Sequence, residues 1–179
     1  MTPGMQPSRN GLLFIAQREA CVLVAYPDPS WSSPSIGFGH NDKTLKQFNT
    51  TTIPEAFAQL KKDASIRAAD LNRWLKVAVS QPQFDALLSC YYEYGLDDGR
   101  AFLAVIAAVN SGDQIGIGTA LLRCCYDDSV VSVGLLYRRA EELLLFYTGN
   151  YGTIGAVQLW RGDPKTTKAE VYTVQGTDI

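Results

Sequence analysis

Apolar residues recur at three- and four-residue intervals over much of the chain, which is the spacing of one face of an α-helix. The first such run covers residues 12–21, and Ser8 or Asn10 stands before it, where a helix N-cap is favoured. The pattern therefore predicts a helix over residues 12–21, with Glu19 near its C-terminal end.

Several later segments also have the pattern of helices. The sequence Thr-Ile-Pro-Glu at residues 52–55 combines a capping box with a proline in the first turn, so a helix is predicted from Ile53 to about Leu75. Residues 81–94 have the composition of a mostly buried helix that ends at Gly95. Further helices are predicted at about 101–110, 113–125 and 132–148, because each gap between them carries Gly, Ser or Asp.

Two other parts of the chain are typical of strands. Ser35-Ile-Gly-Phe-Gly-His40 alternates like a short strand, and its glycines let another backbone or a ligand approach closely. Residues 156–160 and 169–174 resemble two strands joined by residues 161–168, which predicts a β-hairpin near the C-terminal end of the sequence.

Composition narrows the possible classes of protein. The 179 residues are enough for one domain with a sizeable core, and 46% apolar with 19% charged residues is ordinary for a soluble globular protein. A net charge of -2 excludes a polycation that seeks nucleic acid, although a local basic patch stays possible. No apolar run approaches the roughly 20 residues that span a bilayer, and residues 1–10 lack the pattern of a signal peptide. We therefore expect synthesis in a cytoplasm and no stable membrane insertion.

The cysteines and the histidine give no sign of a metal centre. None of the four cysteines has C-x-x-C spacing, each stands in an apolar context, and His40 is the sole histidine. We therefore expect all four cysteines to be free, buried and reduced thiols, namely Cys21, Cys90, Cys124 and Cys125.

The candidate chemistry lies in a pair of carboxylates, Glu19 and Asp28, followed by the Gly-rich run from Ser35 to His40. Cleavage of a glycosidic bond needs one carboxyl group that donates a proton to the leaving oxygen, and a second that stays ionised to manage water or positive charge. A helix end and a β-hairpin can supply two groups from different elements, whose environments can then separate their pKa values.

Four stretches of the chain follow one another in a recognisable order: Glu19-x8-Asp28-Pro with Ser35-Ile-Gly-Phe-Gly-His40, residues 52–63, residues 81–95 and residues 134–141. Together they resemble the phage-type lysozymes, a family of glycoside hydrolases whose members include endolysins. The resemblance implies an α+β, lysozyme-like fold, with a β-hairpin in a small N-terminal lobe, a mostly helical C-terminal lobe and a cleft between them. It does not reach the tail, so we expect a lysozyme-like domain over residues 1–150 and a C-terminal extension over residues 151–179.

The resemblance also implies roles for three residues and no metal or organic cofactor. Glu19 would be the general acid, and Asp28 would activate the water or stabilise the cationic transition state. Ser35 would hold the water in place of the threonine of the family. Six residues separate Asp28 from Ser35 where the family usually has five, so Ser33 is an alternative. Serine keeps the hydroxyl of threonine but lacks the methyl group that stiffens χ1.

Other side chains have weaker assignments. We predict substrate-binding roles for Asn41, Tyr92 and Glu93, of which Glu93 stands where members of the family often have Asn or Gln. His40 is interpreted as a structural residue that anchors the hairpin through a hydrogen bond or ion pair. Arg138 and Arg139 could contact anionic peptidoglycan, but a solvated helix face is the preferred interpretation.

The function implied by the resemblance is hydrolysis of the β-1,4 bond between N-acetylmuramic acid and N-acetylglucosamine in peptidoglycan. A phage would use it for host lysis, with synthesis in the host cytoplasm and action on the wall in the periplasm. One alternative is a virion-associated lysozyme for cell entry, docked on a virion protein through the tail by strand addition. Another is a non-catalytic glycan-binding or structural module, suggested by Ser35 and Glu93.

Overall fold

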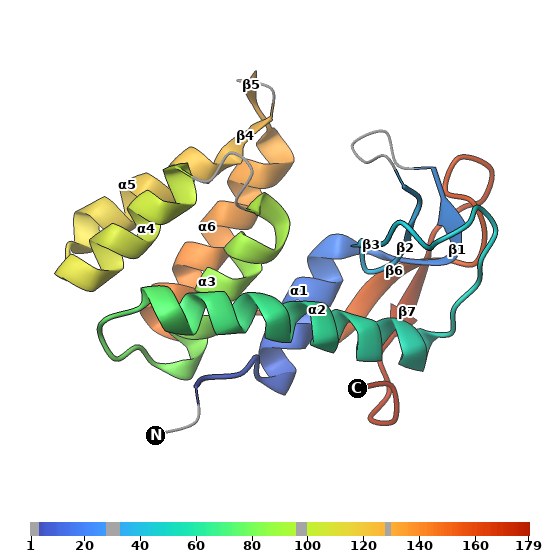
Figure 1. The fold of residues 1–179 in the computed structure, drawn as a ribbon, viewed down its shortest axis with the longest axis horizontal. Helices are drawn as coiled ribbons and strands as arrows, with labels where there is room; N and C mark the ends of the chain where they lie inside the picture. The colour runs from blue at the N-terminus through green and yellow to red at the C-terminus, as the bar shows by residue number, and fades with distance from the viewer. Residues whose placement is uncertain (1–3, 28–32, 96–99, 128–129) are drawn as a thin grey trace. The chain divides into compact units, whose positions relative to one another are not determined.

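The computed structural model describes residues 4–27, 33–95, 100–127 and 130–179 (Figure 1). These residues form helices and strands in the following order: α1 (Arg9–Glu19), β1 (Cys21–Tyr26), β2 (Ser35–Gly37), β3 (His40–Asn41), α2 (Ile53–Trp74), α3 (Gln81–Tyr94), α4 (Arg100–Ser111), α5 (Gln114–Leu122), the 3₁₀ turn η1 (Arg123–Cys125), β4 (Tyr126–Asp127), β5 (Val130–Val131), α6 (Val133–Thr148), β6 (Ala156–Trp160) and β7 (Glu170–Thr173). The expected α+β architecture is confirmed.

The chain divides into two compact units. The sheet unit comprises Leu12–Asp63 and Thr153–Ile179, and the helical unit comprises Met1–Gly11 and Ala64–Gly152. Helices α1 and α2 are each continuous across a boundary between the units.

The sheet unit is built on a five-stranded sheet with the order β3-β2-β1-β6-β7. Strand β1 pairs antiparallel with β2 and parallel with β6, and β6 pairs antiparallel with β7. The predicted C-terminal hairpin is therefore confirmed, and it belongs to the same sheet as β1. The division at residue 150 into a domain and an extension stays a prediction. Buried residues from both sequence segments of the sheet unit form its core, including Ile15, Phe38, Phe57, Val157 and Leu159.

The helical unit contains α3 to α6, the turn η1 and the short pair β4–β5. Its core includes a cluster of aromatic rings, in which Tyr91 lies between Trp74 and Phe102 at centroid distances of 5.2 and 5.1 Å. Buried aliphatic residues of α3, α5 and α6 also contribute to this core, among them Leu87, Ile117 and Leu145.

Local capping explains where most helices begin. The predicted capping box of α2 is confirmed, because the Thr52 N–H donates to Glu55 Oε2 at 2.8 Å and the Glu55 N–H donates to Thr52 Oγ1 at 3.4 Å. Ser80 and Gln83 form the same reciprocal pair at the start of α3. A single cap of this kind contributes about 1 kcal/mol.

The first helix begins earlier than predicted and ends earlier too. Ser8 is its cap, since Ser8 Oγ accepts the Gly11 N–H at 2.9 Å, so α1 starts at Arg9 and not at Leu12. Its last residue is Glu19, and Ala20 then adopts a left-handed conformation with φ 57°, which ends the helix. Residues 21–26, which the prediction did not assign to a strand, form β1.

One further boundary differs from the prediction, and two short strands were not predicted. Helix α5 ends at Leu122 and not near residue 125, because the 3₁₀ turn η1 follows, with Cys124 at non-helical angles. The strands β4 and β5 were not predicted, since each has two residues and no alternation can be recognised over so short a length.

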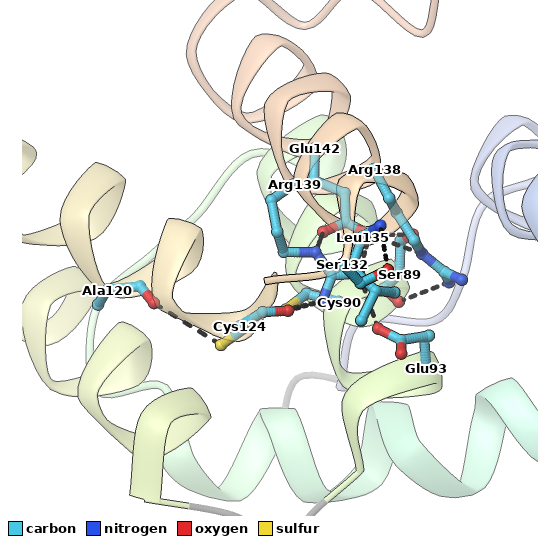
Figure 2. Close-up of polar contacts among 10 residues, drawn as sticks. All are labelled: Ser89, Cys90, Glu93, Ala120, Cys124, Ser132, Leu135, Arg138, Arg139 and Glu142. Atoms are coloured by element: carbon cyan, nitrogen blue, oxygen red, sulfur yellow. Dashed lines mark hydrogen bonds and ion pairs between the residues drawn. The ribbon is translucent and has the colours of Figure 1, made fainter. Parts of the chain in front are cut away.

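A buried ionic network joins α6 to α3 (Figure 2). Arg138 is 7% exposed and Arg139 is fully buried, so the predicted solvated helix face is wrong. Glu142 Oε2 lies 2.8 Å from Arg139 Nε, and Ser89 Oγ donates to Glu142 Oε1 at 2.7 Å. Arg139 Nη2 also pairs with Glu93 Oε2 at 3.0 Å. The charges of these two arginines are thus compensated inside the protein.

All four cysteines are free and buried, as the sequence predicted. Within the described ranges, no helix combines the length and the apolar character that a bilayer-spanning segment requires.

Candidate active site

Glu19 stands at the point where α1 ends and the chain turns into β1. The left-handed Ala20 makes this turn, a conformation that costs an L-residue other than Gly about 1–2 kcal/mol. The Glu19 side chain is half-buried, and its Oε1 atom is shielded from solvent. Strained backbone next to a shielded carboxyl group is typical of a functional site.

The Glu19 carboxyl group lies against the turn between β2 and β3. Gly39 in that turn has φ 79°, and a Cβ atom placed on it would lie 3.7 Å from Glu19 Oε2. Glycine is favoured there by its backbone angle, and the turn lies within van der Waals reach of the carboxyl group. The structure therefore brings the first residue of the candidate motif next to the Gly-rich run.

Ser35 and Asn41 face each other across the hairpin, because the register pairs Ser35 with Asn41 and Ile36 with His40. Ser35 is 1% exposed. Asn41 Nδ2 donates to the carbonyl oxygens of Ser33 and Pro34 at 2.7 and 3.2 Å, and it lies 3.5 Å from Ser35 Oγ. The segment that leads into Ser35 is thus held by one amide side chain.

His40 anchors the hairpin to α2, as predicted. Its Nδ1 atom lies 2.9 Å from Asp63 Oδ2, and Gln59 Nε2 lies 3.1 Å from His40 Nδ1 and donates to Asp63 Oδ1 at 2.8 Å. The three side chains form a closed set of polar contacts, so the structural interpretation of His40 is confirmed.

The remaining predicted residues fall into two groups. Asp28 lies outside the described residues. Tyr92 and Glu93 belong to the helical unit, where Tyr92 is 8% exposed with the Arg67 Cζ atom 4.6 Å from its ring centroid. Glu93 has a side chain 23% exposed and pairs with Arg139. Their predicted substrate-binding roles, and that of Asn41, stay predictions.

The sheet unit also contains a pocket of about 380 Å³ between the hairpin, the loop before α2 and the first turns of α2. Its lining includes Ile36, His40, Leu45, Glu55 and Gln59.

In the part of the chain that the structure describes, no group of three or more His, Cys, Asp or Glu side chains is placed so that it could hold a metal ion.

Sequence reasoning missed two features, one in each unit. It did not foresee that the Asn41 amide binds the segment before Ser35, although cross-strand pairing in so short a hairpin could have indicated it. It also missed two partners of Arg139, Glu93 and Cys90, which lie on α3 far away in sequence.

A glutamate at a helix end, a Gly-rich hairpin against it and a histidine that ties the hairpin to the next helix define a lysozyme-like protein. The sequence model of the phage lysozyme family matches residues 16–142, and the chain belongs to that family.

Individual relatives agree with this assignment. The endolysin of Bacillus phage PZA is 30% identical over 175 residues, which are 97% of this chain and 66% of the relative, so the similarity extends into the tail. The endolysin of Escherichia coli O157:H7 phage FAHEc1 has a similar structure, with a TM-score of 0.73 and 29% identity over 86% of this chain and all of that one. The muramidase domain of SpmX from Asticaccaulis excentricus gives a TM-score of 0.71 at 28% identity, over 80% of this chain and 98% of the domain.

The chain is shorter than several of these relatives. It spans 66% and 65% of the length of the endolysins of Bacillus phages PZA and B103, and 60% of the endolysin of Lactococcus phage c2.

Proposed function

We propose that the chain is a muramidase that hydrolyses the β-1,4 bond between N-acetylmuramic acid and N-acetylglucosamine in peptidoglycan. The observation that carries the proposal is the Glu19 carboxyl group at the end of α1, with Oε2 close to Gly39 in the Ser35–His40 hairpin. Membership of the phage lysozyme family supports it.

In this proposal Glu19 donates a proton to the leaving glycosidic oxygen. Asp28 stays ionised, and either activates the attacking water or stabilises the oxocarbenium-like transition state. Ser35 holds the water through its hydroxyl group. The substrate contacts are assigned to Asn41, Tyr92 and Glu93. As the glycosidic C–O bond breaks, the leaving oxygen takes the Glu19 proton, and a water oxygen bonds to the anomeric carbon and gives its proton to a carboxylate. These steps require no metal or organic cofactor.

The test is release of new reducing ends from purified peptidoglycan. Glu19→Gln keeps the shape of the side chain but cannot donate the proton, so the rate should fall by a factor of about 100 or more. Glu170→Gln, at an exposed carboxylate in β7, is the matched control and should keep the full rate. Turnover that survives Glu19→Gln at the level of the control would refute the assignment.

We also propose host lysis as the use of this activity, with synthesis in the host cytoplasm and action on the cell wall in the periplasm. Relatives named endolysin support lysis. The alternative role in the virion needs a docking surface on the tail. One edge of the tail hairpin already pairs with β1, so β7 is the edge strand that a virion protein would use. Finding the protein in purified particles would favour the virion, and its absence there would favour lysis.

A further inference from the structure

The Asn41 side chain uses both of its polar atoms on the three residues 33–35. Ser33 Oγ donates to Asn41 Oδ1 at 2.8 Å. Asn41 Nδ2 donates to the Ser33 and Pro34 carbonyl oxygens at 2.7 and 3.2 Å and lies 3.5 Å from Ser35 Oγ. One amide thus holds the backbone on the N-terminal side of Ser35 and also reaches the Ser35 hydroxyl group.

These contacts fix which end of the amide faces Ser35. The Asn41 oxygen accepts the Ser33 hydroxyl proton, so the nitrogen is the atom directed toward the two carbonyl groups and Ser35. An amide nitrogen can only donate, so Ser35 Oγ can only accept from it. The proton of Ser35 Oγ then points away from Asn41. The 3.5 Å separation is long for a hydrogen bond, so the contact with the hydroxyl group is weak, and the two bonds to the carbonyl groups hold the amide in place beside it.

Serine needs such support more than threonine would. A threonine at this position has a stiff χ1 angle because its β-carbon is branched, whereas the serine hydroxyl can occupy three staggered positions. The register of the hairpin places Asn41 directly opposite Ser35, so its amide is close enough to restrain a side chain that lacks the methyl group of threonine.

We propose that Asn41 is a positioning residue, which sets the Ser35 hydroxyl for the reaction by holding residues 33–35. The proposal rests on the proposed function, since Ser35 matters only if it holds the attacking water. Asn41 acts here through Ser35, and this role is separate from any contact that Asn41 makes with the substrate. A small displacement of a reacting group can cost on the order of 100-fold in rate, so loss of the amide should lower kcat rather than raise KM.

Four variants test this on the whole chain with peptidoglycan turnover. Asn41→Ala should lower kcat by a factor of roughly 10–100, with KM changed by less than about threefold. Ser35→Thr supplies a second background, because threonine keeps the hydroxyl group and adds the β-methyl group, and the effect of Asn41→Ala is measured against each background separately. In the Ser35→Thr background, Asn41→Ala should cost less than about threefold, because the branched side chain orders its own hydroxyl group. Asn41→Asp should lose activity as the pH rises and the new carboxyl group ionises beside two carbonyl oxygens.

Three results would overturn the proposal. An unchanged kcat in Asn41→Ala would show that the amide is dispensable. An equal loss in the serine and threonine backgrounds would show that Asn41 does not act on the hydroxyl group. A loss confined to KM would make Asn41 a substrate-binding residue instead.

A second measurement does not depend on turnover or on the Ser35→Thr variant. NMR couplings between the Ser35 Hα and Hβ atoms report χ1, and they should indicate one rotamer in the parent chain and averaging in Asn41→Ala. Averaged couplings in the parent would refute the positioning role. If the parent chain shows ordered couplings but no turnover, the proposed function fails and the hold on Ser35 survives.

Discussion

The variant Glu142→Gln tests how much the buried network between α3 and α6 stabilises the protein. Glu142 is fully buried and is in contact with four donor atoms, at 2.7 Å from Ser89 Oγ, 2.8 and 3.2 Å from Arg139 Nε and Nη2, and 3.3 Å from Arg138 Nε. Glutamine keeps the shape but removes the negative charge. It also brings an NH₂ group toward donors that need an acceptor.

The expected loss follows from what remains around Arg139. Its guanidinium group stays fully buried and keeps Glu93 at 3.0 Å as an anionic partner, but Glu93 is partly exposed to solvent. Removing one partner of a buried ion pair typically costs about 3–5 kcal/mol, because the other charge is left without compensation. For a chain of this size that free energy corresponds to a fall in Tm of roughly 6–20 °C.

The assay is urea unfolding at pH 7, followed by tryptophan fluorescence and far-UV circular dichroism. Coincident transitions are required before a free energy of unfolding is calculated. The matched control is Glu170→Gln, which breaks the exposed pair between Glu170 and Arg161 at 2.7 Å, with side chains 50% and 63% exposed. A surface pair of this kind contributes less than about 1 kcal/mol.

Equal losses in Glu142→Gln and Glu170→Gln would refute the reasoning, since burial would then make no difference. A double variant, Arg139→Met with Glu142→Leu, adds a second check. Replacing both partners of a buried pair by apolar residues is often neutral, so this variant should recover most of the stability that Glu142→Gln loses.

Two other predictions concern the buried Asp85. A Cβ atom on Gly11 would lie 2.4 Å from Asp85 Cγ, so Gly11→Ala should lower the free energy of unfolding by about 1–3 kcal/mol. The control is Gly118→Ala, which should cause no such loss because the nearest atom to its Cβ would be 3.8 Å away. Equal urea midpoints for the two variants would contradict the prediction. Burial, and then the hydrogen bond to Asp85, raises the pKa of Tyr151 to about 12. The contribution of the neutral phenol to stability is therefore fully present below pH 10 and is lost as the pH rises from about 10 to 12. In Tyr151→Phe the urea midpoint should therefore fall less at alkaline pH than it does in the parent. Parallel curves for parent and variant would refute the second prediction.

The helices could be predicted where their signals are local. The start of α2 is encoded by Thr52 and Glu55, three residues apart, and the capping box is present in the structure. Strand β1 was missed because the run Cys21–Tyr26 is apolar on both of its faces and shows no alternation. A pattern of period two appears only when one face of a strand meets water.

The prediction that Arg139 lies on a solvated helix face was wrong because its burial depends on contacts that are distant in sequence. A pair of arginines on an amphipathic helix usually lies at the surface, and nothing near them in sequence contradicts this. Their compensating partners come partly from α3, at Ser89 and Glu93, and a single sequence does not indicate that contact.

The candidate site was predicted in part. The Glu19 carboxyl group and the Gly-rich turn are adjacent in the structure, as the motif suggested. The amide of Asn41 was predicted to bind substrate, and its observed contacts are with residues 33–35. Spacing alone could not distinguish Ser33 from Ser35, but the structure assigns them different contacts. Ser33 donates to Asn41, and Ser35 lies opposite it in the hairpin.

The parallel pairing of β1 with β6 has a consequence for synthesis of the protein. Cys21 is aligned with Leu159, so the two neighbours in the sheet leave the ribosome far apart in time. At about 5–20 residues per second, the roughly 140 residues between them take on the order of 10 s to make. Until then Cys21 and Val22 lack the strand they pair with, although Leu23 and Ala25 bond to the backbone of residues 48–51. A nascent chain with this unpaired segment is open to association with other chains. A chain truncated before β6 would keep this part of β1 unpaired and would stay open to association with other chains.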